Sequence, residues 1–199
     1  MSDSGAGEVI YLTGAPASGK STLCNKLASL IPGIKIYEYG NLLADRISKD
    51  CGASISQESL KEKSSALVFE YHVRELDQWL IKDVDSVRNY RHVIIDSHAV
   101  TLEHYGFRII PFSAEFIQQL RLSRICCLYA YSQTITERII DKSEGRPLSG
   151  IESLNMHTSL QMNLAATYSV VSGAPLYCFE NSFENQDLIL EKIGGWLGG

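Results

Sequence analysis

The amino-acid sequence predicts a three-layer α/β domain, in which helices cover both faces of a five-stranded parallel sheet. Three observations support this fold class. Short apolar runs alternate with helical patterns, the runs are apolar on both faces, and no repeat or linker interrupts the 199 residues. A length of 199 residues suits a single domain, expected to span residues 1–199. The ligand of such a sheet is expected at the carboxyl ends of its strands.

Each predicted strand is a short run rich in apolar and β-branched residues, and these runs span residues 8–13, 34–39, 92–96, 125–131 and 175–179. Helical patterns lie between and after them, over residues 20–30, 56–84, 113–122, 132–142, 151–172 and 187–196. Ser56 and Ser132 are expected as N-caps, and Gly173 is expected to end its helix. The side chains expected to face the core from the two longest helices are Phe69, Val73, Leu76 and Leu80, and Leu160, Leu164, Tyr168 and Val171.

The composition, 45% hydrophobic and 21% charged, is that of a globular protein. A net charge of −5 argues against a nucleic-acid-binding surface, because such binding depends on neutralising phosphates. No run approaches the roughly 20 apolar residues that cross a bilayer, and the N-terminus lacks a signal-peptide pattern. We therefore expect a cytoplasmic protein with no nucleic-acid or membrane partner. Its five cysteines form no CxxC pair, and we expect reduced thiols packed as small hydrophobic side chains.

Residues 14–21 read GAPASGKS, which fits the P-loop pattern G-x-x-x-x-G-K-[ST] between an apolar strand and an amphipathic helix. Gly14 and Gly19 let the backbone turn its N–H groups toward an anion, and the following helix presents its positive N-terminus. Lys20 is expected to reach the β and γ phosphates of ATP, and Ser21 to offer its hydroxyl to Mg²⁺. The alternative is an ordinary tight strand-to-helix turn. The residues predicted to bind the cofactor are Gly14, Ala15, Pro16, Ala17, Ser18, Gly19, Lys20, Ser21 and Thr22.

A second apolar strand ends in an acid, since residues 92–96 read HVIID. Asp96 is therefore predicted to hold Mg²⁺ together with Ser21, whereas without a P-loop it would be a plain strand-end acid. His98 follows two residues later and is expected to line the substrate site. A zinc pair with His104 is disfavoured, because no third ligand stands at a suitable spacing.

Arginines follow the third helix-flanked strand in the segment ERIIDKSEGRPLSG. Arg138 and Arg146 are predicted to offset the charge of a phosphoryl group in transfer, on a lid over about residues 138–150. The alternative for Arg138 is a surface ion pair with Asp141 or Glu144. Arg46 and Arg74 either hold an acceptor phosphate or belong to solvated helix faces.

Two classes of nucleotide-binding protein are disfavoured. No Asn-Lys-x-Asp segment selects guanine, which argues against a switch GTPase, and the chain is too short for a mechanical ATPase with its extra helical domain.

The order of these motifs resembles that of the archaeal-type adenylate kinases, which are P-loop nucleoside monophosphate kinases. The resemblance spans most of the chain. Besides the P-loop, it rests on residues 39–41 (YGN), 95–100 (IDSHAV) and 137–146, and on a long helix that ends in Gly173-Ala174. The chain departs from the family at residues 106–112 (GFRIIPF), where the family has Gly-Tyr-x-Pro-Gly-x-Pro, and in a lid with fewer positive charges.

The resemblance implies transfer of the γ-phosphate of ATP to AMP with Mg²⁺, and a sheet in which the strand of Asp96 lies beside the P-loop strand. It implies an acceptor-binding insertion over about residues 40–88, acceptor contacts from Gly40 and Arg74, and homotrimers. We therefore predict a phosphotransferase, with a nucleoside monophosphate kinase first. Two alternatives stay open. One is a P-loop kinase for a modified nucleotide, a nucleoside or another metabolite, and the other is a nucleotide-binding regulatory module.

Overall fold

The structure is a computed structural model that describes residues 6–52, 69–141 and 150–198. In this part of the chain a five-stranded sheet has the order β2-β3-β1-β6-β7, and all neighbouring strands run parallel. The strands are β1 (Val9–Gly14), β2 (Lys35–Glu38), β3 (Val93–Asp96), β6 (Arg124–Tyr129) and β7 (Leu176–Glu180). The predicted fold class is therefore confirmed, as is the place of the Asp96 strand beside the P-loop strand.

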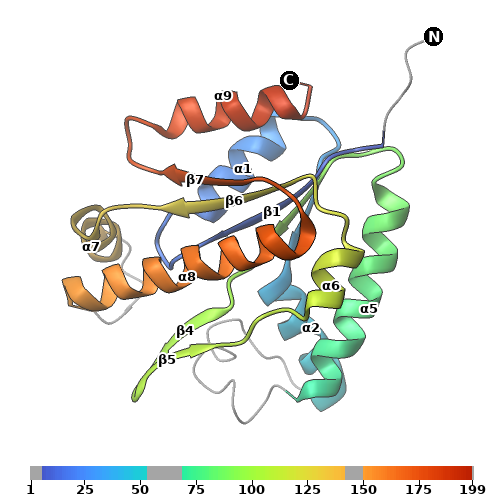
Figure 1. Cartoon of the computed structure of the whole chain (residues 1–199), viewed down its shortest axis with the longest axis horizontal. Helices are drawn as coiled ribbons and strands as arrows, with labels where there is room; N and C mark the ends of the chain where they lie inside the picture. Colours follow the sequence, from blue (N-terminus) through green and yellow to red (C-terminus); the bar gives the residue numbers. More distant parts are fainter. Residues whose placement is uncertain (1–5, 53–68, 142–149, 199) are drawn as a thin grey trace.

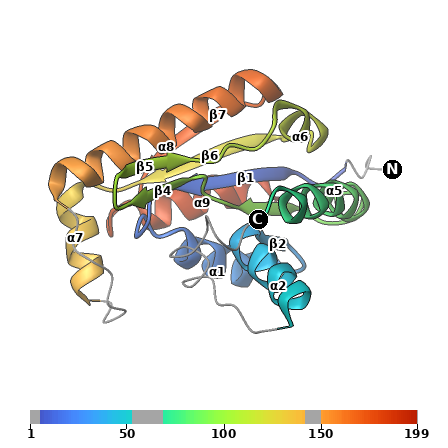
Figure 2. The same ribbon diagram turned by 90° about the horizontal axis from the view of Figure 1, so that it is seen from below.

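Helices cover both faces of the sheet (Figures 1 and 2). One face carries α1 (Lys20–Leu30) and α9 (Gln186–Trp196), and the other carries α2 (Tyr39–Cys51), α5 (Glu70–Val87), α6 (Ala114–Gln119) and α8 (Ile151–Ser172). The remaining helix, α7 (Ser132–Asp141), follows the carboxyl end of β6.

Residues of β1 alternate between two hydrophobic cores. Val9 and Tyr11 pack with the α5, α6 and α8 side, whereas Ile10 and Leu12 pack with the α1 and α9 side. Because successive strand residues point to opposite faces, a central strand covered on both sides must be apolar throughout. This is the physical reason why the strands are recognisable as continuous apolar runs.

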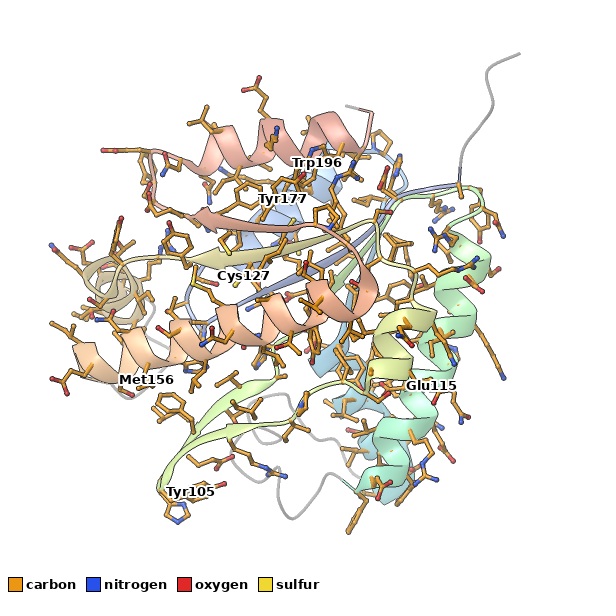
Figure 3. All side chains as sticks on the ribbon, viewed as in Figure 1. Tyr105, Glu115, Cys127, Met156, Tyr177 and Trp196 are labelled. Atoms are coloured by element: carbon orange, nitrogen blue, oxygen red, sulfur yellow. The ribbon has the colours of Figure 1, made fainter. Side chains whose placement is uncertain are left out.

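A hairpin that the sequence did not predict leaves the sheet after β3. Its strands, β4 (Val100–Glu103) and β5 (Gly106–Ile109), pair antiparallel and project beside α8 (Figure 1). His157 of α8 holds the hairpin at its base, with Nε2 at 3.0 Å from the carbonyl oxygen of Val100. Burial lowers the pKa of this imidazole. Tyr105 lies at the far tip (Figure 3).

Several helix predictions need correction. Helix α5 is described only from Glu70, so the predicted start at Ser56 lies outside the described residues. Phe69 is its N-cap and is 55% exposed, so placing it in the core was wrong, whereas Leu76 and Leu80 are buried as predicted. Helix α2 was not predicted at all.

The buried stripe of α8 lies about one residue away from the predicted one. It consists of His157, Gln161, Ala165 and Tyr168. Leu160, Leu164 and Val171 are only partly buried. The apolar pattern was misleading here because two of the four buried residues are polar side chains with hydrogen bonds.

The cysteine prediction holds in part. All five thiols are free, and Cys24, Cys126 and Cys127 are buried. Cys51 and Cys178 are exposed instead, because α2 ends at Cys51 and β7 is an edge strand. Among the described residues, no helix combines the length and the apolar character needed to cross a bilayer.

Asp77 of α5 makes stability depend on pH. Its carboxylate accepts a hydrogen bond from the Tyr39 hydroxyl at 2.7 Å, and burial raises its pKa to about 6. The folded state therefore binds a proton more tightly than the unfolded state, so this contribution is complete below pH 4 and is lost as the pH rises through 6. We expect Asp77→Asn to raise the free energy of unfolding at pH 7.5 by on the order of 1 kcal/mol, after allowing for partial solvent screening. Thermal melts of both proteins from pH 4 to 8 would check this. An equal stabilisation of Asp77→Asn at pH 4 and at pH 8 would contradict it.

Candidate functional site

The predicted P-loop joins β1 to α1 at the carboxyl edge of the sheet. Gly14 and Gly19 have φ angles of +153° and +94°. A Cβ on Gly14 would lie 2.3 Å from the carbonyl oxygen of Leu128, and one on Gly19 would lie 2.3 Å from Nδ2 of Asn181. Both positions therefore need glycine for conformation and for space. Helix α1 begins directly after this turn, and no side chain caps its N-terminus, so its first N–H groups are available to an anion.

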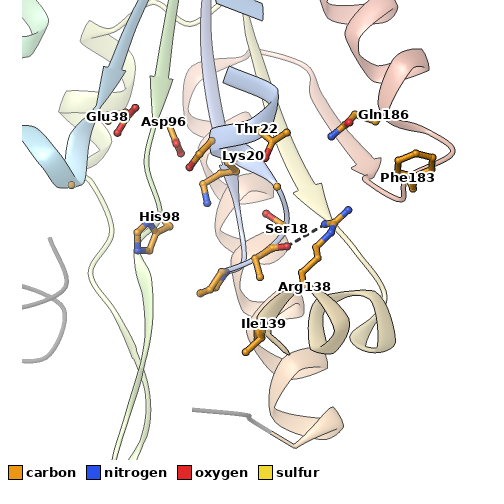
Figure 4. A pocket seen from close by; sticks show the side chains of 15 residues that line it. Ser18, Lys20, Thr22, Glu38, Asp96, His98, Arg138, Ile139, Phe183 and Gln186 are labelled. Atoms are coloured by element: carbon orange, nitrogen blue, oxygen red, sulfur yellow. Dashed lines mark hydrogen bonds between the residues drawn. The ribbon is translucent and has the colours of Figure 1, made fainter. Parts of the chain in front are cut away.

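A pocket of about 360 Å³ opens over this loop. Figure 4 shows its two sides, with Glu38, Asp96 and His98 on one side of the loop and Arg138, Phe183 and Gln186 on the other. The predicted site residues that line it are Pro16, Ala17, Ser18, Gly19, Lys20, Ser21, Thr22, Gly40, Asp96, His98 and Arg138. Gly14, Ala15, Arg46 and Arg74 do not line it, and Arg146 lies outside the described residues.

Lys20 is held at the mouth of the loop. Its Nζ donates a hydrogen bond to the carbonyl oxygen of Gly14 at 3.1 Å. This contact fixes the ammonium group above the turn, in the pocket that the loop residues line. The arrangement suits the binding of a polyphosphate, which needs a point charge beside a ring of backbone donors.

Ser21 and Asp96 offer the oxygen donors that suit Mg²⁺. Asp96 ends β3 and pairs in register with Leu12 of β1, so its carboxylate lies beside the start of the P-loop. Mg²⁺ is usually held by one or two carboxylates together with the phosphates of its nucleotide. Within the described residues, no group of three or more His, Cys, Asp or Glu side chains is placed to hold a metal ion. The hydroxyl of Ser21 and the carboxylate of Asp96 are oxygen donors of the kind that Mg²⁺ prefers.

The two histidines considered for zinc lie at opposite ends of the hairpin segment. His98 precedes β4 and lines the pocket, whereas His104 lies in the turn between β4 and β5 and packs edge-on against Tyr105.

Arg138 binds the outside of the P-loop. Its guanidinium donates to the carbonyl oxygen of Ala17 at 3.1 Å and to that of Asn181 at 2.6 Å. Burial lowers its pKa from the usual value. These two hydrogen bonds go to backbone carbonyls; among the described residues no ion pair with Asp141 is found, and Glu144, the other partner considered, lies outside the described residues. The guanidinium stands at the rim of the nucleotide pocket and connects α7 to the loop.

Asn181 was not predicted and supports the P-loop from below. Its side chain is buried, and Nδ2 donates to the carbonyl oxygen of Ser18 at 2.7 Å. A single asparagine after a strand carries no motif in the sequence, so only the fold reveals this contact. It places β7 directly behind the phosphate-binding turn.

We expect Asn181→Ala to raise the KM for ATP severalfold and to lower the free energy of unfolding by about 1–3 kcal/mol, because the buried Ser18 carbonyl loses its donor. Steady-state kinetics and chemical denaturation would measure both effects. Asn25→Ala is the matched control, since Asn25 is an exposed residue of α1. Equal behaviour of the two variants would contradict the supporting role.

A buried polar pair connects α8 to the P-loop strand. Nε2 of Gln161 donates to the Thr13 hydroxyl at 2.7 Å, and both residues are almost fully buried. Thr13 immediately precedes Gly14. Tyr11 lies on the same side of β1, and burial raises the pKa of its phenol well above the usual value, so it stays neutral.

The acceptor side of the pocket differs from the prediction. Arg46 is paired with Glu75 of α5, and Arg74 is paired with Glu70 at 2.8 Å, so both arginines lie in helix-surface ion pairs. The pocket is lined there by Glu38, a residue that was not predicted. No signal in the sequence marked it, because the predicted strand over residues 34–39 ends at Tyr39 and Glu38 lies inside that run.

Comparisons with known proteins agree with this geometry. A family model described as an AAA domain, AAA_17, matches residues 13–155. Curated adenylate kinases of Thermoplasma acidophilum and Pyrococcus horikoshii are each 24% identical to the chain, over 184 and 176 residues. The first match covers 92% of this chain and 94% of that protein, and the second covers 87% and 86%. The resemblance to archaeal-type adenylate kinases is thus confirmed.

Solved structures share the fold at lower identity. A sugar kinase from Janibacter sp. has a TM-score of 0.52 and 15% identity, with 96% of this chain and 95% of that chain covered. A shikimate kinase from Acinetobacter baumannii, solved with shikimate, has a TM-score of 0.50 and 20% identity, with 94% and 90% covered. The family model spans well over half of the sequence. The chain therefore belongs to the AAA_17 family and is a P-loop kinase whose curated relatives include adenylate kinases.

Proposed function

We propose that this chain transfers the γ-phosphoryl group of Mg-ATP to a small-molecule acceptor. One observation carries the proposal: Lys20, Ser21 and Asp96 line a single pocket over the P-loop, with Arg138 at its rim. The curated relatives favour a nucleoside monophosphate, with AMP first, as the acceptor.

The mechanism is in-line transfer, with no covalent role for the protein. The N–H groups of the loop and the Lys20 ammonium would bind the phosphates and neutralise charge that develops on the leaving oxygen. Magnesium held by Ser21 and Asp96 would supply further neutralisation of the β and γ oxygens. Arg138 is proposed to offset charge on the transferred group. Arg146, which lies outside the described residues, is proposed to share this role. Closure over the site would exclude water and suppress hydrolysis.

The rim beyond Arg138 is proposed to bind the base of the donor nucleotide. Phe183 is 93% exposed there, and Gln186 offers an amide beside it (Figure 4). An exposed aromatic face in the same pocket as a guanidinium suits the stacking of a purine.

A second candidate acceptor follows from the described contacts. Because Arg46 and Arg74 are held in ion pairs and Glu38 lines the pocket, this side suits an acceptor without a phosphate, such as a nucleoside or another metabolite.

Release of ADP from Mg-ATP, measured with nucleoside monophosphates, the corresponding nucleosides and no acceptor, tests the proposal. Stimulation by AMP would support the adenylate kinase assignment. Stimulation by a nucleoside would support the second acceptor. Tight ATP binding without turnover in any reaction would contradict a kinase and favour a nucleotide-binding regulatory module.

A further inference from the structure

We propose that Glu38 is the catalytic base of this kinase and that the acceptor is an uncharged hydroxyl compound. The inference rests on the proposed phosphotransferase function and, of the two acceptor classes named there, selects the one without a phosphate. Two features of the described residues carry it, the position of Glu38 and the charges around it. The different chemistry of hydroxyl and phosphate acceptors completes the argument.

Glu38 lies on the acceptor side of the pocket at a fixed distance from the P-loop strand. It is the last residue of β2 and pairs in register with Asp96 of β3, which in turn lies next to β1. With about 4.8 Å between neighbouring strands, Glu38 stands about 10 Å from the end of β1. Figure 4 shows Glu38 and Asp96 side by side, both across from Lys20. Glu38 and the P-loop line the same pocket, so an acceptor bound on the Glu38 side would face the phosphates on the loop.

The local structure fixes the position of the Glu38 carboxylate. It is the N-cap of α2, where the helix dipole favours a negative charge. The side-chain amide of Asn41 donates a hydrogen bond to Oε2. The second carboxylate oxygen, Oε1, is the atom we assign to the acceptor.

The charges on this side of the pocket oppose a phosphate acceptor. In residues 6–52, 69–141 and 150–198, the cations that line the pocket are Lys20, above the loop, and Arg138, at the opposite rim. Both belong to the donor side. A nucleoside monophosphate would bring about two negative charges next to Glu38 and Asp96, whereas an alcohol brings none.

The two acceptor classes also differ in their need for a base. A phosphate oxygen is already ionised at neutral pH and attacks without losing a proton. A hydroxyl oxygen must lose its proton as its bond to the γ-phosphorus forms and the bond from that phosphorus to the β–γ bridging oxygen breaks. The products are the phosphate ester and ADP, and the proton passes to Oε1 of Glu38 and then to solvent. Transfer to a hydroxyl therefore needs a base such as this carboxylate, whereas transfer to a phosphate is hindered by its negative charge.

The test compares Glu38→Gln with the charge-matched control Glu191→Gln, an exposed residue of α9. The amide introduced by Glu38→Gln would keep the hydrogen bond from Asn41 but would accept no proton. With water as the attacking hydroxyl, we expect Glu38→Gln to lower the kcat of basal Mg-ATP hydrolysis by about a hundredfold. The KM for ATP and the half-saturating Mg²⁺ concentration should stay within twofold of the wild type. The melting temperature should stay within a few degrees. In the wild type, AMP should stimulate ADP release by less than twofold.

Three results would overturn the inference. If Glu38→Gln hydrolyses ATP at the wild-type rate, Glu38 is not the base. If excess Mg²⁺ restores the activity of the variant, Glu38 acts through the metal instead. Strong stimulation by AMP that persists in the variant would show a phosphate acceptor. The proposed phosphotransferase fails separately, if the wild type turns over no ATP with or without the nucleosides and nucleotides of the acceptor panel, or if Lys20→Met turns over as much as the wild type.

Discussion

Replacing Lys20 with methionine is expected to lower the rate of phosphoryl transfer by about 10²–10³-fold. The ammonium group is the cation placed at the mouth of the P-loop, and methionine keeps the length of the side chain while removing its charge. Loss of one preorganised group that stabilises developing charge typically costs this much. ADP release under saturating Mg-ATP would measure the loss.

Lys82→Met is the matched control, because Lys82 is exposed on α5 and away from the pocket. It should retain wild-type turnover. Both variants should melt within a few degrees of the wild type, since Lys20 makes only one hydrogen bond to the backbone among its described contacts. A folded Lys20→Met protein with full activity would refute the proposed mechanism.

Substituting alanine for Gly14 is expected to lower the free energy of unfolding by about 2–5 kcal/mol and to abolish tight ATP binding. The new Cβ would lie 2.3 Å from the carbonyl oxygen of Leu128 and 2.7 Å from Oγ of Ser18, at a φ of +153°. Backbone strain and overpacking each contribute about 1–3 kcal/mol in such cases. Because the obstacle is backbone of β6, neither a rotamer change nor a small side-chain movement relieves it. Chemical denaturation and nucleotide titration would measure the two losses.

Gly195→Ala provides the control for this prediction. Gly195 lies in α9 with nothing within 4 Å of its added Cβ, so alanine should stabilise the helix by about 0.5–1 kcal/mol. If Gly14→Ala behaved like Gly195→Ala, the turn would be more tolerant than the geometry indicates.

Much of the fold could be predicted because β1, β3 and β6 are buried on both faces over most of their length and are apolar there at almost every position. The hairpin of β4 and β5 could not be predicted in this way. Its strands are four residues long, carry mixed side chains and rest on α8 through a histidine. Helix α2 was missed because its first residue, Tyr39, continues the β-branched and aromatic pattern of β2.

Sequence motifs revealed the donor side of the site better than the acceptor side. The P-loop is local, so its spacing alone specifies a geometry, and the structure places Lys20, Ser21 and Asp96 around one pocket. Asn181 binds the P-loop and Glu38 lines the pocket, but both come from distant strands, and no local pattern connects them to the site. Arg46 and Arg74 illustrate the opposite problem. Their charge alone did not decide between an acceptor phosphate and a helix surface, and the structure pairs both with carboxylates of α5.

The hydrogen bond between Gln161 and Thr13 also sets how far α8 can slide along the sheet. A shift of one helical turn, about 5.4 Å, would break this hydrogen bond and leave the buried amide of Gln161 without its acceptor, which is costly for a buried polar group. The pair thus fixes the axial position of α8 on the sheet. In descendants of this sequence the two residues should change together, as a polar pair or as an apolar one, and the double replacement should be tolerated better than either single one.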